Sequence, residues 1–515
     1  MHAIRRIRTL STMALSSENF FKYTSGRFIH DQEHHEALHY RRFNVDALKE
    51  DISRSTGAAS VMDMSKLSEG RCNKVFQVQL ADSQKVIARI PMPFAGPQHL
   101  VTASEVATMT FLRNRLGLTQ VPRIISWLSR ASETPVGAEY IVMDVADGIE
   151  LGAVWEILTM HQKIHVVLEW VKFEWKVIHA FSRGGYGSLY FRKDLPTNQS
   201  REIFLANSDQ PDDEYVLGPA VSGPGYWEEN YGTPDDIKLD RGPWPDVSSY
   251  LKSLSNCERA WIEKYAKRPT RMYAAPWELP VHLRIPEEHL RLLDMYDKVC
   301  QCLISPDERE ALMRGTVEIS AVIDWQHTVV LPLYLTSFVP RFVDYASALP
   351  GQDEAEFAKE QAYLRKTYHT MYADANINTV WAAALAHQGQ ANMSQLMPEA
   401  ARICWHGGYT VLKQQMVEAA LDWKYIAPRV PCPLAGEHFS EKDLAKAEAD
   451  VLEWKKVERA LDDTKERIGM CGNAVRPDHY NRAVQINKEL REEWASTGGR
   501  GLMEGANPRD IWPFG

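Results

Sequence analysis

The sequence is short of cysteine, has no excess of basic residues and contains no long hydrophobic run. Its seven cysteines are scattered over 515 residues, unlike the dense frameworks of small disulfide-bonded proteins, so we interpret them as reduced thiols. Cys300 and Cys302 have no second ligand pair at zinc-site spacing, and two ordinary helical residues explain them. The longest apolar stretch, about 328–339, is interrupted by Pro332 and is far shorter than the ~20 residues of a membrane-spanning helix. These shortages argue against a disulfide scaffold, a zinc module and an integral membrane protein.

The charge balance argues against a nucleic-acid-binding surface. The chain carries 59 basic and 68 acidic residues, a formal net charge of −9. No block of Lys or Arg longer than a few residues follows the first ten positions. Small molecules are therefore the favoured partners, while the substrate and the oligomeric state are unknown from the sequence. The length, with 44% hydrophobic and 25% charged residues, predicts a globular protein of two lobes or domains.

The first seventeen residues have the composition of a mitochondrial transit peptide. They contain Arg5, Arg6 and Arg8, several Ser and Thr, and no acidic residue before Glu18. Arginine-rich, acid-poor segments of this kind direct proteins to mitochondria. An unstructured N-terminus that carries these arginines by chance is the alternative. We predict a transit peptide and mitochondrial localisation.

The pattern of the remaining chain changes from strand-like to helical. Residues 66–91 alternate like two strands joined by a turn at 81–84. Helical spacing covers 102–116, and 140–143 have the pattern of a short buried strand. Between 192 and 250 the periodicity is weak and Gly, Pro and Asp are frequent, which indicates a long loop or lid. Further helices are predicted at about 161–182, 286–303, 355–375, 380–388, 396–422, 440–466 and 480–494.

These patterns predict an α+β fold, in which a small β-rich N-lobe precedes a large and mostly helical C-lobe. The predicted segments are the transit peptide at 1–17, an N-terminal extension at 18–60, the N-lobe at 61–145, the C-lobe at 146–495 with a loop insertion at 192–250, and a C-terminal tail at 496–515.

One carboxylate stands at the end of a β-prone apolar run. Residues 318–327 read Glu-Ile-Ser-Ala-Val-Ile-Asp-Trp-Gln-His, so Asp324 follows a predicted short strand. A carboxylate in such a position can hold the Mg²⁺ that neutralises charge on transferring phosphates. Capping of the next turn is the simpler alternative.

Six short motifs occur in the order that a known family shows. They are Leu-Ser-Glu-Gly-Arg-Cys-Asn-Lys-Val-Phe at 67–76, Val-Ile-Ala-Arg-Ile-Pro at 86–91, Ser-Glu-Val-Ala-Thr at 104–108, Tyr-Gly-Ser-Leu-Tyr-Phe at 186–191, Arg-Gly-Pro-Trp at 241–244 and Ile-Asp-Trp-Gln at 323–326. Together they resemble the aminoglycoside-phosphotransferase-like kinase family, and more closely its fungal mitochondrial branch called altered inheritance of mitochondria protein 9. The resemblance covers most of residues 18–495. It implies a protein-kinase-like bilobal fold, ATP and Mg²⁺ as cofactors, and phosphate transfer to a small hydroxylated acceptor.

The resemblance also implies roles for particular residues. Arg89 would replace the lysine that most kinases use to hold phosphates, and Glu105, sixteen positions later, would pair with it. An arginine can clamp phosphate oxygens, although its planar fork is no steric copy of an ammonium group. Asp324 would bind the metal. A surface arginine and a solvated glutamate without contact are the alternative.

A loop and a connector complete the implied nucleotide site. Ser68, Gly70 and Asn73 belong to the loop that would cover the phosphates, although a plain β-turn explains this segment equally well. Residues 139–145 would form the connector whose backbone meets the adenine edge.

The catalytic loop of the family is missing from the sequence. The family pattern is His-x-Asp followed by Asn five residues after the Asp, where the Asp orients or deprotonates the acceptor hydroxyl. None of the seventeen histidines has Asp two residues later. Asp307 lies seventeen residues before Asp324 but is a weak substitute, because Leu312 stands where the Asn belongs. Either the protein has lost the segment or an exon is absent from the sequence.

Two functions therefore stay open at this stage. The first is an ATP-dependent phosphotransferase, and the second is a mitochondrial pseudoenzyme of the same fold that acts by binding nucleotide or partners. A helical adaptor that binds no nucleotide is a third and more general reading.

Overall fold

The computed structural model covers the whole chain and describes two lobes in detail. The described residues are 18–178, 180–206, 208–221, 237, 239–266, 279, 281–302, 311–312, 322–332, 335, 339–340, 342–343, 353–374, 396–428, 430–497, 512 and 514. The predicted transit peptide, the predicted helix at 380–388 and Asp307 lie outside them.

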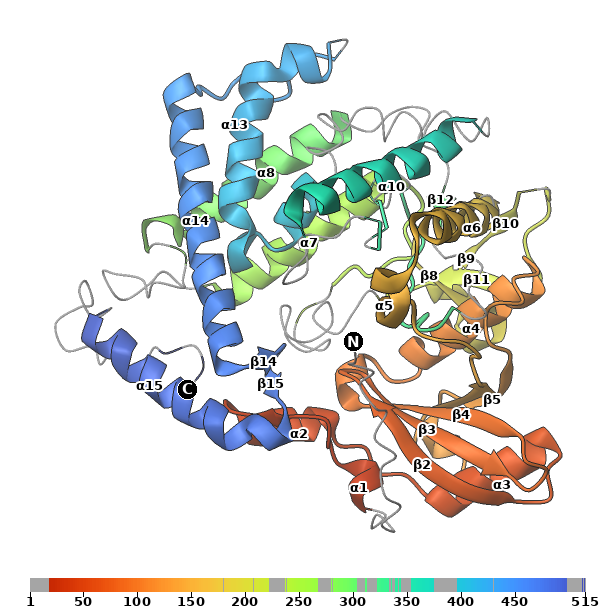
Figure 1. Cartoon of the computed structure of the whole chain (residues 1–515). Helices are drawn as coiled ribbons and strands as arrows, with labels where there is room; N and C mark the ends of the chain where they lie inside the picture. The colour runs from red at the N-terminus through yellow and green to blue at the C-terminus, as the bar shows by residue number, and fades with distance from the viewer. Residues whose placement is uncertain are drawn as a thin grey trace.

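A five-stranded antiparallel sheet forms the centre of the N-lobe (Figure 1). Its order is β2-β3-β4-β6-β5, so the predicted strand pair and the predicted strand at 140–143 are confirmed. Side chains of β3 alternate between buried and half-buried, and Phe76, Val78 and Leu80 enter the core as a period of two requires. The strands are β2 (Val61–Glu69), β3 (Asn73–Leu80), β4 (Lys85–Pro91), β5 (Ile124–Leu128) and β6 (Tyr140–Asp144).

Helix α4 (Leu100–Asn114) connects β4 to β5 and confirms the helix predicted from spacing. It is buried on nearly every side, since its apolar residues, among them Val106, Phe111 and Leu112, belong to the largest hydrophobic core. A helix that is apolar all round needs cover on all faces. The sheet and the C-lobe strands supply this cover, because α4 contacts β5, β6 and β8 (Ser188–Phe191).

The N-terminal extension joins the N-lobe to the end of the chain. Its elements are α1 (Glu18–Phe21), β1 (Arg27–Phe28), α2 (Gln32–His39) and α3 (Val45–Thr56). Helix α3 begins at Asn44, whose side chain accepts a hydrogen bond from the Ala47 amide at 3.1 Å, and it buries Leu48 and Ile52 against the sheet core. Strand β1 pairs with β15 (Ala474–Val475), so segments far apart in sequence lie side by side (Figure 1).

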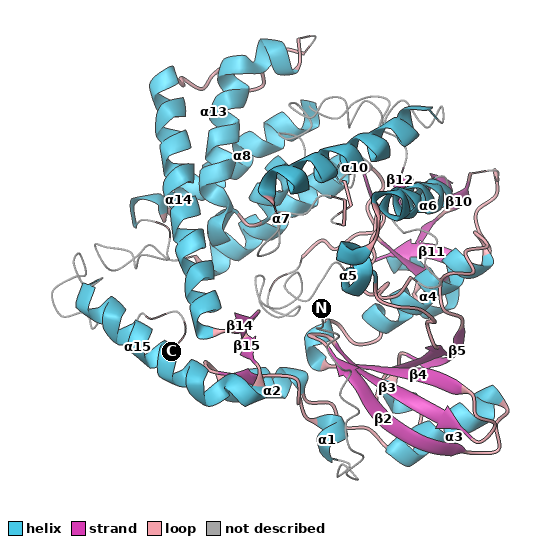
Figure 2. Cartoon of the chain, viewed as in Figure 1, coloured by secondary structure: helices cyan, strands magenta, loops and turns pink. Residues whose placement is uncertain are grey.

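The larger lobe is mostly helical (Figure 2). Its helices are α5 (Leu151–Val154), α6 (Met160–Ile178), α7 (Val247–Tyr265), α8 (Pro286–Cys302), α10 (Glu354–Asp374), α13 (Tyr409–Ile426), α14 (Glu441–Ile468) and α15 (Tyr480–Thr497). Its short strands, besides β8 and β15, are β7 (Phe181–Arg183), β9 (Arg201–Glu202), β10 (Phe204–Leu205), β11 (Tyr215–Gly218), β12 (Ala311–Leu312), β13 (Leu331–Pro332) and β14 (Met470–Cys471).

Several helix predictions are confirmed and two need correction. Helices α6, α8, α10, α14 and α15 lie where the spacing placed them. The helix predicted at 396–422 is interrupted, because a π-helical turn at Cys404–Gly408 precedes α13. Helix α7 was not predicted, although Asp246 caps it by accepting from the Ser249 amide at 2.7 Å.

The arrangement confirms the predicted α+β, kinase-like architecture of a small sheet lobe and a larger helical lobe. The segment after β6 is the short link between them (Figures 1 and 2). Strands β9, β10 and β11 and the start of α7 fall within the predicted insertion at 192–250. In the described part of the chain, no helix combines the length and the apolar character that crossing a bilayer demands.

Candidate functional site

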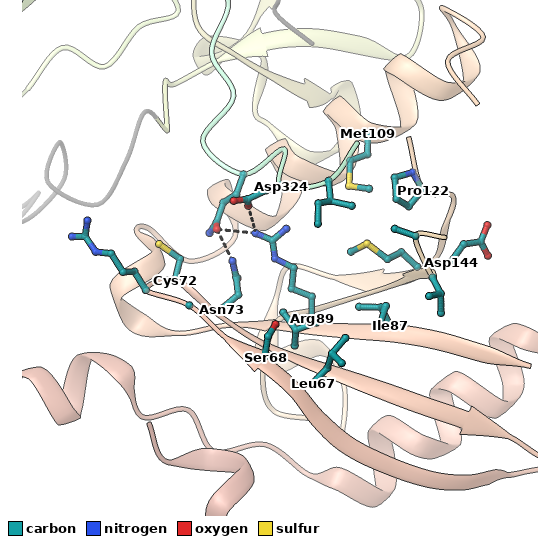
Figure 3. A pocket seen from close by; sticks show the side chains of 18 of the residues that line it. Leu67, Ser68, Cys72, Asn73, Ile87, Arg89, Met109, Pro122, Asp144 and Asp324 are labelled. Atoms are coloured by element: carbon teal, nitrogen blue, oxygen red, sulfur yellow. Dashed lines mark hydrogen bonds and ion pairs between the residues drawn. The ribbon is translucent and has the colours of Figure 1, made fainter. Parts of the chain in front are cut away.

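A cavity of about 550 Å³ opens between the N-lobe sheet and the segment around Asp324 (Figure 3). Its walls come from β2, β3, β4, α4, the link after β6 and residues 323–327. The sequence-predicted residues Ser68, Gly70, Asn73, Arg89 and Asp324 all line it, and Glu105 lies directly behind Arg89. The structure therefore brings together residues that the sequence separates by more than 250 positions.

One half of the cavity is apolar. Leu67 from β2 and Ile323 line it and remain 57% and 64% exposed, which is high for large aliphatic side chains. Exposed apolar groups that line one hollow mark a binding surface more often than scattered ones do. The other apolar residues of this half are Val75, Ile87, Met109, Pro122 and Met143.

Apart from Met143, which lies in the predicted connector at 139–145, sequence reasoning did not assign these apolar residues to a site. The signal was present in part, since Leu67 directly precedes the predicted phosphate loop and Ile323 directly precedes Asp324. The end of β6 contributes Asp144 to the lining, and the link after it contributes Val145 and Ala146. The predicted connector at 139–145 therefore reaches the cavity only through its C-terminal part.

Arg89 and Glu105 form the ion pair that the sequence predicts. Nη1 of Arg89 contacts Oε1 of Glu105, which is 3% exposed. The pair is positioned by β4 and by the buried face of α4. Burial raises the pKa of Glu105, and the positive charge of Arg89 opposes this shift. Its role in ligand binding stays a prediction.

The other side of the Arg89 guanidinium reaches across the cavity to Asp324. Nη2 donates to Oδ1 of Asp324 at 2.9 Å and to Oε1 of Gln326 at 3.0 Å (Figure 3). The Asp324 side chain is 76% exposed. Its backbone lies in the left-handed region, with a φ of 68°, which aspartate tolerates better than most residues.

Trp325 anchors the segment that presents Asp324. This tryptophan is buried, its indole nitrogen donates to the Val322 carbonyl at 3.1 Å, and its ring stacks on Phe173. The Val322 amide donates to the Gln120 carbonyl at 2.9 Å. A buried neighbour thus holds the backbone while Asp324 stays exposed.

The predicted phosphate loop is a tight turn and also a wall of the cavity. The Gly70 amide donates to the Asn73 carbonyl at 3.1 Å. In one orientation the Asn73 side-chain amide donates to Oε1 of Gln326 at 2.6 Å; in the reversed orientation its oxygen instead accepts from Nη2 of Arg89 at 2.6 Å. The β-turn reading and the lining role are therefore compatible.

Two neighbouring groups are uncharged near neutral pH. Burial lowers the pKa of His327, and its Nε2 donates to the Ala95 carbonyl at 2.7 Å. Burial raises the pKa of the Cys72 thiol to about 11, so this thiol is a poor nucleophile. Cys72 belongs to the predicted phosphate loop, whereas sequence reasoning had not assigned His327 to the site.

The donor set fits a magnesium ion that is held mainly by a substrate. Among the described residues, no group of three or more His, Cys, Asp or Glu could hold a metal ion. Mg²⁺ in nucleotide sites typically takes one or two carboxylates and completes its shell with phosphate oxygens and water. Asp324 keeps its Oδ2 away from the Arg89 contact and can serve as such a carboxylate.

Comparison with known proteins finds similar fungal proteins. No family model matches it. It is 30% identical over 510 residues to a subtelomeric hrmA-associated cluster protein of Aspergillus fumigatus, covering 86% of this chain and 95% of the relative. Altered inheritance of mitochondria protein 9 of Yarrowia lipolytica is 27% identical over 276 residues, 49% of this chain and 46% of the relative.

A solved aminoglycoside phosphotransferase, APH(4)-Ia, is also similar. Its identity is 11%, its TM-score is 0.33, and the match covers 81% of this chain and 99% of the other. This similarity is too low to assign the fold, so the assignment depends on the topology and on the residues described above.

A five-stranded sheet lobe with a buried Arg–Glu pair that faces an aspartate across a cavity is the arrangement that the resemblance to the aminoglycoside-phosphotransferase-like kinase family implied. The chain belongs to the same family as the Aspergillus subtelomeric hrmA-associated cluster proteins. The predicted resemblance to altered inheritance of mitochondria protein 9 is confirmed at lower identity.

Proposed function

We propose that the cavity binds a magnesium–ATP complex. The observation that carries this proposal is the position of Arg89, which contacts Glu105 from α4 and Asp324 from the far wall at the border of the apolar half. Kinase-like enzymes hold phosphates with a cation that a helix glutamate orients, and they hold the metal with an aspartate.

The parts of the nucleotide then have separate places. The base lies in the apolar half, between Leu67 and Ile323, with the backbone of the link after β6 at its edge. The phosphates lie beside Arg89 and the loop from Ser68 to Asn73. Magnesium supplies charge neutralisation when bound, and Asp324 is the residue that would hold it.

We infer binding without measurable turnover. Phosphoryl transfer needs a residue that orients or deprotonates the acceptor, and members of such a catalytic unit act together, so its loss costs orders of magnitude in rate. The family's His-x-Asp-x₄-Asn pattern is absent from the whole sequence. The catalytic role of Asp307 stays a prediction that concerns residues outside the described ones.

Calorimetric titration of the full chain with ATP tests this function. We expect binding in Mg²⁺ that weakens in EDTA, together with no release of ADP over hours. Absence of binding under both conditions would support the helical adaptor instead. ADP release on addition of a small hydroxylated acceptor, abolished in Asp307→Asn, would establish the second candidate, a phosphotransferase.

We also propose that residues 1–17 direct the protein to mitochondria. The support is their arginine-rich, acid-free composition and the mitochondrial name of the relatives called altered inheritance of mitochondria protein 9. Fusing the segment to a fluorescent protein in a fungal cell should produce mitochondrial fluorescence. A matched fusion with Arg5, Arg6 and Arg8 changed to Glu should stay in the cytosol, and equal distribution of both fusions would contradict targeting.

A further inference from the structure

Arg71 is the second arginine that lines the cavity, and its surroundings differ from those of Arg89. The guanidinium of Arg89 is engaged by Glu105, Asp324 and Gln326. Arg71 is exposed at the tip of the β2–β3 hairpin, and no residue in the described ranges forms an ion pair with it. Its guanidinium carbon lies 5.0 Å from the centre of the Phe94 ring. A cation–π contact at an exposed position is weak, so Arg71 can leave it for a stronger partner.

Strand register places Arg71 at the end of the cavity farthest from the apolar half. Along β4, Ile87 lies opposite Met143 of β6, and Arg89 lies opposite Val75 of β3. Two residues further, Pro91 lies opposite Asn73, the first residue of β3 after the hairpin tip. The order along the cavity is therefore the apolar half, then Arg89, then Arg71.

The turn that carries Arg71 is closed by its own backbone. A glycine-rich loop binds phosphates through free backbone N–H groups. Here the Gly70 amide already donates to the Asn73 carbonyl at 3.1 Å, so it is not free for a phosphate. The loop has a single glycine. The Arg71 side chain at this tip can supply a donor in place of the Gly70 amide.

The hairpin base is also held firmly. Glu69, the last residue of β2, accepts from the Thr24 amide at 2.7 Å and the Ser25 amide at 3.2 Å. It also pairs with the buried Lys74. These contacts hold the backbone beneath Arg71 in place, while its exposed side chain can still move to contact a ligand.

The charges beside Arg89 call for a further cation. Arg89 is the single guanidinium that contacts the two carboxyl groups of Glu105 and Asp324. A triphosphate adds several negative charges, and one Mg²⁺ offsets two of them. A guanidinium binds phosphate oxygens through two parallel N–H bonds, which suits the end of a nucleotide.

We propose that Arg71 leaves the Phe94 ring and binds the terminal phosphate of the bound nucleotide. This inference rests on the proposed function, since it assigns one more ligand group to the same site. It makes Arg71 a residue that distinguishes triphosphates from shorter nucleotides.

Titration of the full chain with a series of ligands tests the assignment. Adenosine, AMP, ADP and ATP in Mg²⁺ are compared for the wild type, Arg71→Ala, Arg71→Lys and Arg42→Ala. Arg42 is an exposed arginine that does not line the cavity, so it serves as the matched control. We expect Arg71→Ala to lower the affinity for ATP by about tenfold, a typical effect of losing one charge-assisted contact. The affinities for adenosine and AMP should stay unchanged. Arg71→Lys should retain part of the ATP affinity, and Arg42→Ala all of it.

Two results would overturn the assignment while leaving the proposed function intact. Equal ATP affinity of the wild type and Arg71→Ala would remove Arg71 from the phosphate site. An equal loss for adenosine and ATP would show that the substitution disturbs the hairpin rather than a phosphate contact. A wild-type chain that binds none of the four ligands would instead remove the nucleotide function and this inference together.

Discussion

The two walls of the cavity are built in different ways. On the N-lobe wall, Arg89 and Glu105 are buried between the sheet and a helix that is covered on nearly every side. On the opposite wall, Asp324 is 76% exposed, has a positive φ and depends on a buried tryptophan beside it. The first wall is part of the hydrophobic core, whereas the second is a short segment that leaves the Asp324 side chain exposed.

Because of this difference, residues of one wall should mainly stabilise the fold, whereas residues of the other should mainly contact the ligand. A buried charge that loses its partner pays the full cost of its desolvation, whereas an exposed carboxylate is hydrated with or without a partner. Substitutions on the N-lobe wall should therefore change folding first and binding as a consequence. Substitutions on the Asp324 wall should change binding and leave folding intact.

Replacing Glu105 by Gln should have the largest effect. The substitution leaves the guanidinium of Arg89 buried beside a neutral amide, and breaking a buried pair in this way typically lowers the free energy of unfolding by about 3 kcal/mol or more. Urea denaturation measures the change. Glu50→Gln on the exposed face of α3 is the matched control and should be neutral. Equal stability of both variants would erase the distinction between the walls.

A pH dependence of stability should also arise in the N-lobe, behind the cavity wall. Glu139 is buried beneath the start of α4, where it accepts from the His99 amide at 2.6 Å and faces Thr102 and Arg41. Burial raises the pKa of Glu139 to about 7. A raised carboxyl pKa favours the folded state below the unfolded pKa, and this contribution is lost as the pH rises through the folded value.

The wild type should therefore lose stability between pH 5 and pH 8. The variant Glu139→Gln should not show this loss. Thermal unfolding at pH 5 and pH 8 measures the difference. Relative to the wild type, the variant's free energy of unfolding should increase at pH 8, by about 2 kcal/mol at most. The same difference at both pH values would show that Glu139 ionises normally in the folded chain.

On the opposite wall, Asp324→Asn should change binding alone. Because the side chain is exposed, the free energy of unfolding should stay within about 0.5 kcal/mol of the wild type. The affinity for ATP in Mg²⁺ should fall by about tenfold, the size expected for one lost charged ligand. In EDTA the variant should bind ATP at least as well as the wild type, because a negative charge has been removed. A comparable loss with and without Mg²⁺ would contradict the metal role.

The smallest effect should come from Leu67→Ala in the apolar half. Leu67 is already 57% exposed, so its removal costs little stability. The lost apolar contact should weaken adenosine and ATP alike by roughly threefold to tenfold. Met62→Ala on the same strand, also exposed but away from the cavity, is the control. If the two alanine variants bind adenosine equally well, the base does not lie against Leu67.

Local patterns were sufficient to predict much of the N-lobe. Alternation placed β3 and β4 with their turn, and helical spacing placed α4 to within about two residues of its observed ends. The contact between Arg89 and Glu105 was expected from the family resemblance rather than from a local pattern. Helix α7 carries a usable signal in Asp246 and the spacing of Leu251 and Leu254, but its polar, loop-like preceding segment concealed it.

Long-range contacts were not predictable in the same way. Strand β1 consists of two residues, too few for alternation to register, and it finds its partner β15 more than 440 positions later. The exposed residues Leu67 and Ile323 line the apolar half of one cavity only because the two lobes face one another. Arg71 belonged to the predicted phosphate loop, but only the register of β4 placed it beyond Arg89.

The amino-acid sequence by itself determined many of the helices and strands, the family resemblance and the absence of a His-x-Asp-x₄-Asn loop, because each depends on residues close together in the chain. Only the tertiary structure decided that Arg89 lies between Glu105 and Asp324 and that an apolar slot adjoins them. Such contacts join residues 235 positions apart, and they depend on how the lobes pack rather than on any local preference.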